Sequence, residues 1–157
     1  MQDLVEKLIR KNKIISTMES CTGGGLANAI TNIPGASEIL KFSAVTYSNE
    51  FKIKMGVSSD IIDKYSVYSM EIACEMSKSI SEFSLSSYGV GITGKLQRSD
   101  INNPYGKDNI VYISIYDREN NKYYNKELEV TKDTREENKG LVIDEVIDML
   151  LSLLEEL

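Results

Sequence analysis

Residues 14–31 read IISTMESCTGGGLANAIT, and this stretch organises the interpretation of the whole chain. Its first five residues are mostly apolar or β-branched, a pattern that predicts a buried strand. Three consecutive glycines follow, and Leu26, Ala27 and Ile30 then begin a helical pattern. A strand that turns into a helix leaves backbone N–H groups unpaired, with the helix dipole behind them. The stretch therefore predicts a site for an anion or a developing oxyanion at the turn.

Two hydroxyl side chains, Ser20 and Thr22, lie on this predicted turn. Each can cap the helix or act as a nucleophile, and the sequence leaves both interpretations open. Cys21 is a further nucleophile candidate, but it has no histidine near it as an activating base. The turn is not a P-loop, because no Lys-Ser or Lys-Thr follows the glycines, and it is not a G-x-G-x-x-G motif. Phosphoryl transfer is therefore disfavoured.

Composition predicts one soluble globular domain over residues 1–157, since 41% of them are hydrophobic and 27% are charged. No apolar run is long enough to span a membrane and the N-terminus lacks a secretory signal, so a cytoplasmic location is expected. The formal net charge of −6 argues against a nucleic-acid partner, which would require a basic face.

The absence of histidine narrows the possible chemistry. It excludes Ser-His-Asp and Cys-His mechanisms and every histidine-ligated metal. Proton transfer near neutral pH then has to use Lys, Tyr, Glu, Asp or water. The two cysteines, Cys21 and Cys74, are far apart and have no metal-ligand spacing, so neither a disulfide nor a zinc site is expected.

Hydrophobic periodicity predicts helices and strands that alternate along the chain. Helices are expected over residues 2–11, from the glycine turn to about 32, 60–64, 69–83 and from about 134, and strands over 14–18, 40–47, 88–93, 110–116 and 122–130. Residues 33–37 should break a helix, and residues 95–109 should form a long polar loop. This order predicts a single-domain, three-layer α/β/α sandwich with a mixed sheet.

Ligand sites in such sheets form where strand ends meet helix starts. Three polar segments lie at predicted strand ends, namely the Ser20 turn, residues 47–52 and the Thr93-Gly94 pair. We expect them to converge on one pocket.

Those segments, with others, resemble the C-terminal domain family of the competence- and damage-inducible protein CinA, which includes nicotinamide-nucleotide amidases. The resemblance covers nearly the whole chain, in order and with similar spacing. The matching pieces are Glu19-Ser20-Cys21-Thr22-Gly23-Gly24, Pro34-Gly35-Ala36-Ser37, Tyr47-Ser48-Asn49 with Lys52, Gly56-Val57, and Gly91-Ile92-Thr93-Gly94.

The resemblance implies hydrolysis of the carboxamide of nicotinamide mononucleotide to nicotinate mononucleotide and ammonia, without a metal or cofactor. It implies Ser20 as nucleophile, Lys52 as its base, and Tyr47 as a neighbouring hydrogen-bonding or proton-transfer residue. It also implies a homodimer that binds a pyridine nucleotide. The substrate-binding residues that it implies are Cys21, Thr22, Gly23, Gly24, Asn49, Thr93, Gly94 and Arg135.

The residues themselves are compatible with this chemistry. Amide hydrolysis needs a nucleophile, a proton acceptor and an oxyanion site. Ser20 can supply the first, and the N–H groups of residues 21–23 can supply the third. Without histidine, a lysine whose pKa is lowered by burial is a suitable base. By itself Lys52 could equally be a solvated surface lysine, and Tyr47 an aromatic core residue.

The sequence departs from the family after Thr93-Gly94. Family members continue with Ile-Ala-Gly-Pro and further glycines, whereas this chain continues Lys95-Leu96-Gln97-Arg98. Lys95 and Arg98 could pair with a phosphate or could be solvated loop charges. A second arginine after Arg135 is also absent, with Lys139 in its neighbourhood. The alternative function is therefore a catalytically silent module for pyridine-nucleotide binding or regulation, and a changed amide substrate is a third possibility.

Overall fold

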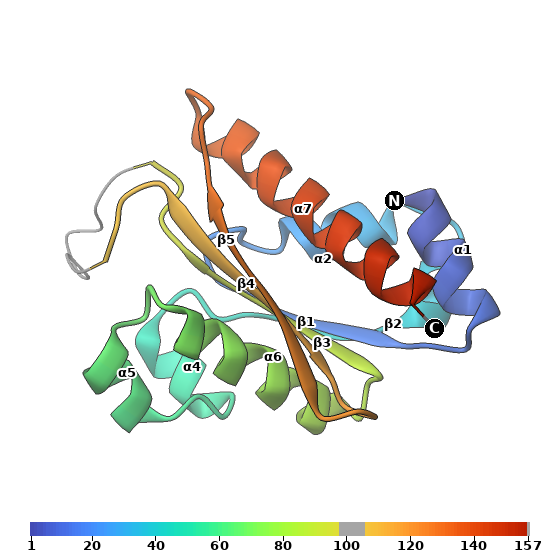
Figure 1. The fold of residues 1–157 in the computed structure, drawn as a ribbon, viewed down its shortest axis with the longest axis horizontal. Helices are drawn as coiled ribbons and strands as arrows, with labels where there is room; N and C mark the ends of the chain where they lie inside the picture. The colour runs from blue at the N-terminus through green and yellow to red at the C-terminus, as the bar shows by residue number, and fades with distance from the viewer. Residues whose placement is uncertain (98–105, 157) are drawn as a thin grey trace.

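A mixed β-sheet with helices on both faces forms the body of the protein (Figure 1). The structure is a computed structural model, and it describes residues 1–97 and 106–156. The strands in these ranges are β1 (Ile15–Glu19), β2 (Leu40–Val45), β3 (Tyr88–Gly94), β4 (Ile110–Asp117) and β5 (Lys122–Glu129). The helices are α1 (Gln2–Arg10), α2 (Gly25–Thr31), α3 (Ala36–Ile39), α4 (Asn49–Lys54), α5 (Ser59–Tyr65), α6 (Met70–Ser84) and α7 (Arg135–Glu155).

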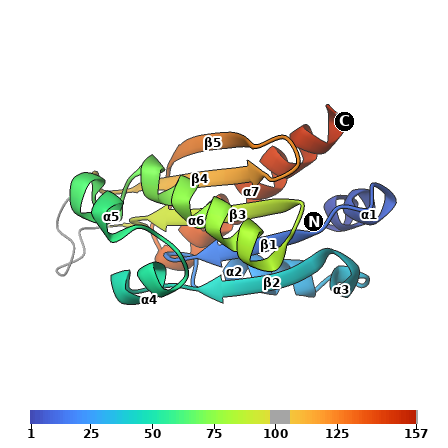
Figure 2. The same ribbon diagram turned by 90° about the horizontal axis from the view of Figure 1, so that it is seen from below.

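The sheet has the strand order β2-β1-β3-β4-β5. Strand β1 pairs in parallel with β2 and β3, while β3, β4 and β5 pair antiparallel. Figures 1 and 2 show α1, α2 and α7 on one face of the sheet and α4, α5 and α6 on the other. The predicted three-layer α/β/α sandwich with a mixed sheet is confirmed.

Strands β1 and β3 are buried along their whole length, as expected for strands covered by helices on both faces. On one face, Val90 and Ile92 of β3 belong to the same apolar cluster as Val142 and Val146 of α7. On the other face, helix α6 lies unusually close to β3. A Cβ on Gly91 would lie 2.3 Å from the carbonyl oxygen of Ala73, so only glycine permits this approach.

Two short helices were missed by the sequence interpretation. Helix α3 begins within the predicted break at 33–37, after Gly35 adopts a left-handed conformation with φ 89°. Strand β2 ends at Val45, not at 47, and helix α4 begins at Asn49. The Ser48 hydroxyl accepts a hydrogen bond from the Phe51 N–H and caps α4. One or two helical turns carry too little periodicity to be recognised in a sequence.

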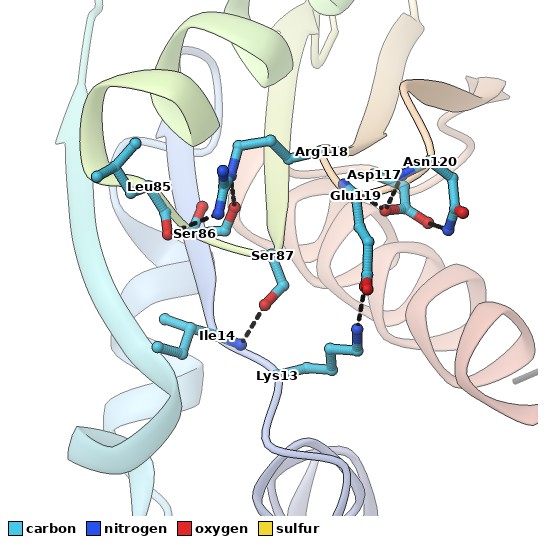
Figure 3. Close-up of polar contacts among 9 residues, drawn as sticks. All are labelled: Lys13, Ile14, Leu85, Ser86, Ser87, Asp117, Arg118, Glu119 and Asn120. Carbon is cyan, nitrogen blue, oxygen red and sulfur yellow. Dashed lines mark hydrogen bonds and ion pairs between the residues drawn. The ribbon is translucent and has the colours of Figure 1, made fainter.

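Polar contacts close the end of the sheet at which β1 and β3 begin (Figure 3). The Ser87 hydroxyl accepts from the Ile14 N–H, and the Arg118 guanidinium donates to the carbonyls of Leu85 and Ser86 after α6. These contacts satisfy backbone groups at the end of a helix. The candidate site lies at the opposite end. None of the described helices is both long and apolar enough to cross a membrane.

Candidate active site at the carboxyl end of the central strands

Ser20 directly follows β1 at the carboxyl end of the parallel part of the sheet. Its N–H donates to the Ile92 carbonyl of β3 at 3.0 Å, which anchors the start of the turn. The chain leaves β1 toward β2 on one side and later returns to β3 on the other, so the strand order changes direction here. Ligands of open α/β sheets bind at such switch points. Sequence and topology therefore indicate the same position.

Lys52 lies against Ser20 inside the protein. Its Nζ donates to the Ser20 hydroxyl at 3.0 Å and to the Thr46 carbonyl at 2.7 Å. Only 2% of Lys52 is exposed, which excludes the interpretation as a solvated surface lysine. Burial lowers the pKa of Lys52 to about 8. At pH 7 roughly a tenth of such an amine is neutral and can accept a proton.

Glu19 is a buried residue to which the sequence analysis gave no role in the site. Its fully buried carboxylate accepts from the Thr22 hydroxyl at 2.6 Å and from the N–H groups of Leu26 and Ala27 at 2.9 and 3.1 Å. These contacts hold the turn onto the start of α2. The available signal was an acidic residue within eight positions of a helix start, where negative charge is favourable.

The contacts of Glu19 correct one expectation. The first N–H groups of α2 are not available to an external anion, because the Glu19 carboxylate accepts them. They also decide between the two hydroxyls of the turn. Thr22 is buried and donates to Glu19, whereas Ser20 lies against a lysine. Ser20 is therefore the nucleophile candidate that the geometry favours.

The backbone of the turn still offers hydrogen-bond donors beside Ser20. The Gly23 N–H donates to the Ser20 carbonyl at 3.0 Å. Over residues 1–97 and 106–156, the N–H groups of Cys21 and Thr22 have no acceptor on another residue. Two of the three expected oxyanion donors thus remain available. The Cys21 side chain does not compete as nucleophile, since burial raises the pKa of its thiol to about 12.

The first two turns of α7 bring cations to this turn. Arg135 Nη2 donates to the Tyr47 hydroxyl at 3.3 Å. Lys139 Nζ lies 3.6 Å from the position that a Cβ on Gly23 would occupy. Tyr47 is 64% exposed, so it is not a core aromatic residue. Its described contact is with Arg135, and no hydrogen bond to Ser20 or Lys52 is found among the described residues.

The remaining predicted site residues lie at neighbouring positions. Asn49 is the first residue of α4, the helix that carries Lys52. Thr93 is the penultimate residue of β3, next to the Ser20 turn, but its buried hydroxyl donates to the Val67 carbonyl at 2.7 Å. Gly94 follows with φ 154°, and a Cβ there would lie 2.5 Å from the Ile110 carbonyl oxygen. Thr93 and Gly94 therefore shape the strand end through backbone and buried contacts.

Lys95 is enclosed instead of facing a ligand. Its side chain is 1% exposed, and its Nζ lies 3.5 Å from both the Gly106 carbonyl and the Asp108 carboxylate. The ammonium also lies over the Tyr68 ring, 4.9 Å from the centroid. These contacts hold the end of the polar loop against the α5–α6 connection. Arg98, the other predicted phosphate contact, lies outside the described residues.

Comparison with solved structures agrees with this fold. The crystal structure of the competence/damage inducible protein CihA from Agrobacterium tumefaciens superposes with a TM-score of 0.84 at 25% identity, covering 97% of this chain and 94% of that one. A CinA superfamily protein from Escherichia coli superposes with a TM-score of 0.86 at 24% identity, covering 97% and 87%.

Comparison of sequences identifies the family. A protein described as competence-damage inducible from Clostridium botulinum (strain Okra / Type B1) is 35% identical over 151 residues, which are 94% of this chain and 36% of the relative. A relative from Clostridium kluyveri is 42% identical over 112 residues, 71% of this chain and 27% of the relative. The chain spans about a third of the length of these relatives. The model of the CinA C-terminal domain matches residues 1–154, and the chain therefore belongs to the CinA C-terminal domain family.

Proposed function

We propose that this chain is an amidase that converts nicotinamide mononucleotide to nicotinate mononucleotide and ammonia, with Ser20 as nucleophile and Lys52 as its base. The observation that carries the proposal is the 3.0 Å contact between Lys52 Nζ and Ser20 Oγ, made by a lysine whose burial lowers its pKa to about 8. A serine beside such a lysine is a known variant of triad chemistry. The choice of nicotinamide mononucleotide rests on the family resemblance.

The first half of the reaction forms an acyl-enzyme. Neutral Lys52 takes the proton of the Ser20 hydroxyl as Oγ bonds to the carboxamide carbon. The carbonyl oxygen becomes an oxyanion, for which the N–H groups of Cys21 and Thr22 are the available donors. The C–N bond then breaks, and the Lys52 ammonium returns its proton to the leaving nitrogen, which departs as ammonia.

The second half hydrolyses the ester. Lys52, neutral again, accepts a proton from a water molecule that attacks the acyl carbon. The bond to Oγ breaks, Ser20 recovers its proton from Lys52, and the nicotinate product leaves. The balance is one amide and one water converted to one carboxylic acid and one ammonia. Glu19 supports both halves by holding the turn that carries Ser20 and the two N–H donors.

Ammonia release from nicotinamide mononucleotide is the direct test. The purified protein should release ammonia and nicotinate mononucleotide in equal amounts, and more slowly from nicotinamide or asparagine. Mass spectrometry of acid-quenched reactions should find the nicotinate-nucleotide acyl group on a peptide containing Ser20. Two results together would contradict the mechanism: single-turnover experiments that show turnover without this adduct, and a Ser20→Ala variant that keeps full activity.

A silent nucleotide-binding module is the second candidate. The enclosed Lys95, which stands where the family sequence continues into a glycine-containing segment, favours it. Under this alternative, calorimetry detects binding of nicotinamide mononucleotide while no ammonia is released. The same two measurements therefore separate the candidates.

A further inference from the structure

We propose that the hydroxyl of Thr46 is a positioning group that holds Lys52 after Ser20 has been acylated. In the resting protein, Lys52 Nζ is held by the Ser20 hydroxyl and the Thr46 carbonyl. Acylation of Ser20 removes the first of these partners, and the Thr46 hydroxyl takes its place. This inference rests on the proposed function for the acylation step, whereas the contacts that support it are those of the resting protein.

The Thr46 hydroxyl is buried without a hydrogen-bond partner. Thr46 is 1% exposed, and no partner for its Oγ1 is found in the part of the chain that the structure describes. Thr17, a buried threonine of β1, is paired by contrast, since its hydroxyl donates to Ser43 at 2.7 Å. A buried hydroxyl that gives up its hydrogen bonds to water without replacing them lowers stability. An unpaired hydroxyl beside the candidate nucleophile therefore indicates a contact that forms during the reaction.

The register of the sheet places Thr46 next to Ser20. Strands β1 and β2 pair in parallel, and the last pair in their register is Glu19 with Val45. The Thr46 N–H donates to the Glu19 carbonyl at 2.9 Å, so the two chains still run side by side one residue beyond β2. The next residues on the two chains, Ser20 and Thr46, are therefore neighbours.

The side chains of Ser20 and Thr46 lie on the same face of the sheet. Two positions earlier on the two strands, Met18 and Ala44 pack in one apolar cluster with residues of α6. Side chains alternate between the faces of a strand, so Ser20 and Thr46 continue on the α6 face. Helix α4, which carries Lys52, lies on that face too (Figures 1 and 2). The three side chains thus meet on one side of the sheet.

The acyl-enzyme changes what Lys52 needs from its neighbours. Lys52 has then given its proton to the departing ammonia, so Nζ carries two N–H donors and one lone pair. The lone pair has to face the attacking water, while Ser20 Oγ has become an ester oxygen, which accepts hydrogen bonds poorly. Thr46 can accept both N–H groups, one with its carbonyl and the other with its hydroxyl, after a small rotation of the amine about the carbonyl contact. This arrangement directs the lone pair at the water.

Steady-state kinetics of Thr46→Val test this role, because valine keeps the shape of the side chain and lacks the hydroxyl. With nicotinamide mononucleotide, kcat and KM should both fall about tenfold or more, and kcat/KM, which reports acylation, should stay within about twofold. The acyl group on Ser20 should accumulate in acid-quenched reactions. Thr46→Ser should recover most of the wild-type kcat, and Thr17→Val, the matched control, should leave kcat and KM unchanged. An unchanged kcat in Thr46→Val, or an equal fall in kcat and kcat/KM, would overturn the proposal.

Unfolding in urea tests the exchange of partners without any turnover. In the wild-type protein, Thr46→Val removes an unpaired hydroxyl, so the urea midpoint should stay the same or rise. Ser20→Ala takes away the serine partner of Lys52, so the Thr46 hydroxyl should bind the amine in that background. There Thr46→Val should lower the midpoint by about 0.3 M or more. Thr17→Val removes a paired hydroxyl and should lower the midpoint equally in both backgrounds.

The two measurements separate this proposal from the amidase proposal. A loss of stability in Thr46→Val that is the same with and without Ser20 would overturn the exchange, even if ammonia is released. A loss confined to the Ser20→Ala background, in a protein that releases no ammonia, keeps the exchange between Ser20 and Thr46 and rejects the amidase.

Discussion

The ammonium of Lys52 lies 3.0 Å from the hydroxyl oxygen of Ser20, although 32 positions separate the two residues in the chain. Helix α4 makes this contact possible, because it turns the buried Lys52 back toward the end of β1 while its neighbours Phe51 and Ile53 remain exposed. The Thr46 carbonyl fixes the same ammonium from the segment that precedes α4. The Lys52 ammonium is therefore held between the turn after β1 and the segment between β2 and α4.

Replacing Ser20 by alanine should abolish turnover and leave the fold intact. Removal of a nucleophile eliminates the covalent route, so ammonia release should fall at least about a thousandfold. The Ser20 side chain does not cap α2, since the N-cap position is Gly24, and the melting temperature should change by only a few degrees. Ser152→Ala, an exposed serine on α7, is the control and should be fully active. Retained turnover in Ser20→Ala would leave the hydroxyl without a catalytic role.

Lys52→Arg should lower turnover at least about a hundredfold, as should Lys52→Met. Arginine keeps the positive charge but cannot accept a proton, and general-base assistance is typically worth that factor or more. Lys54→Arg changes the neighbouring exposed lysine, which pairs with Glu50, and should have no effect. Steady-state assays at saturating substrate give the comparison. An active Lys52→Arg enzyme would mean that charge alone is needed at this position.

The rate should rise with pH through the pKa of Lys52. Burial places this pKa at about 8, and only the neutral amine accepts the serine proton. Below pH 8, kcat/KM should therefore increase about tenfold per pH unit, and above pH 8 it should level off. The phosphate of the substrate titrates near pH 6 and lies outside this window. A profile that is flat between pH 6.5 and 9 would exclude Lys52 as the base.

Glu19→Gln should impair both stability and catalysis. The carboxylate accepts three hydrogen bonds, and a carboxamide would turn an NH₂ group toward N–H donors. We expect a loss of about 1–3 kcal/mol in the free energy of unfolding, measured with urea. Displacement of the turn should also lower kcat about tenfold or more. Glu50→Gln on the exposed face of α4 serves as the control. An unchanged kcat in Glu19→Gln would show that Glu19 does not contribute to catalysis.

Gly91→Ala should be strongly destabilising, with a loss of about 2–3 kcal/mol or more. The added Cβ would lie 2.3 Å from the Ala73 carbonyl oxygen, so α6 has to move away from β3. Gly140→Ala is the matched substitution, because nothing lies within 4 Å of its Cβ in α7. It should stabilise the protein by up to about 1 kcal/mol through helix propensity. Similar urea midpoints for the two variants would show that the close contact of α6 and β3 is not needed.

The sequence alone determined the framework of this protein. An apolar segment, three glycines and a helical pattern predicted β1, the turn and α2, since strand and helix periods are local properties. The alternation of apolar residues in β4 and the long amphipathic pattern of α7 likewise predicted a strand and a helix. The missing histidine excluded histidine-based mechanisms, and the family resemblance, not the residues alone, implied Ser20 with Lys52 as its base. Short helices α3 and α4 escaped because one turn offers no period to detect.

The tertiary structure decided what each candidate residue can do. Lys52 and Lys95 are both buried, and their contacts distinguish them, since Lys52 lies against the Ser20 hydroxyl whereas Lys95 is enclosed by Asp108 and Gly106. Contact with Glu19 removes Thr22 as a nucleophile and closes the helix start to external anions, and no local pattern encodes that contact. The approach of Arg135 and Lys139 to the turn depends on how α7 packs across the sheet. The burial, ion pairing and pKa of a side chain depend on its neighbours in three dimensions. The chemical properties of the site residues could therefore be assigned only from the folded structure.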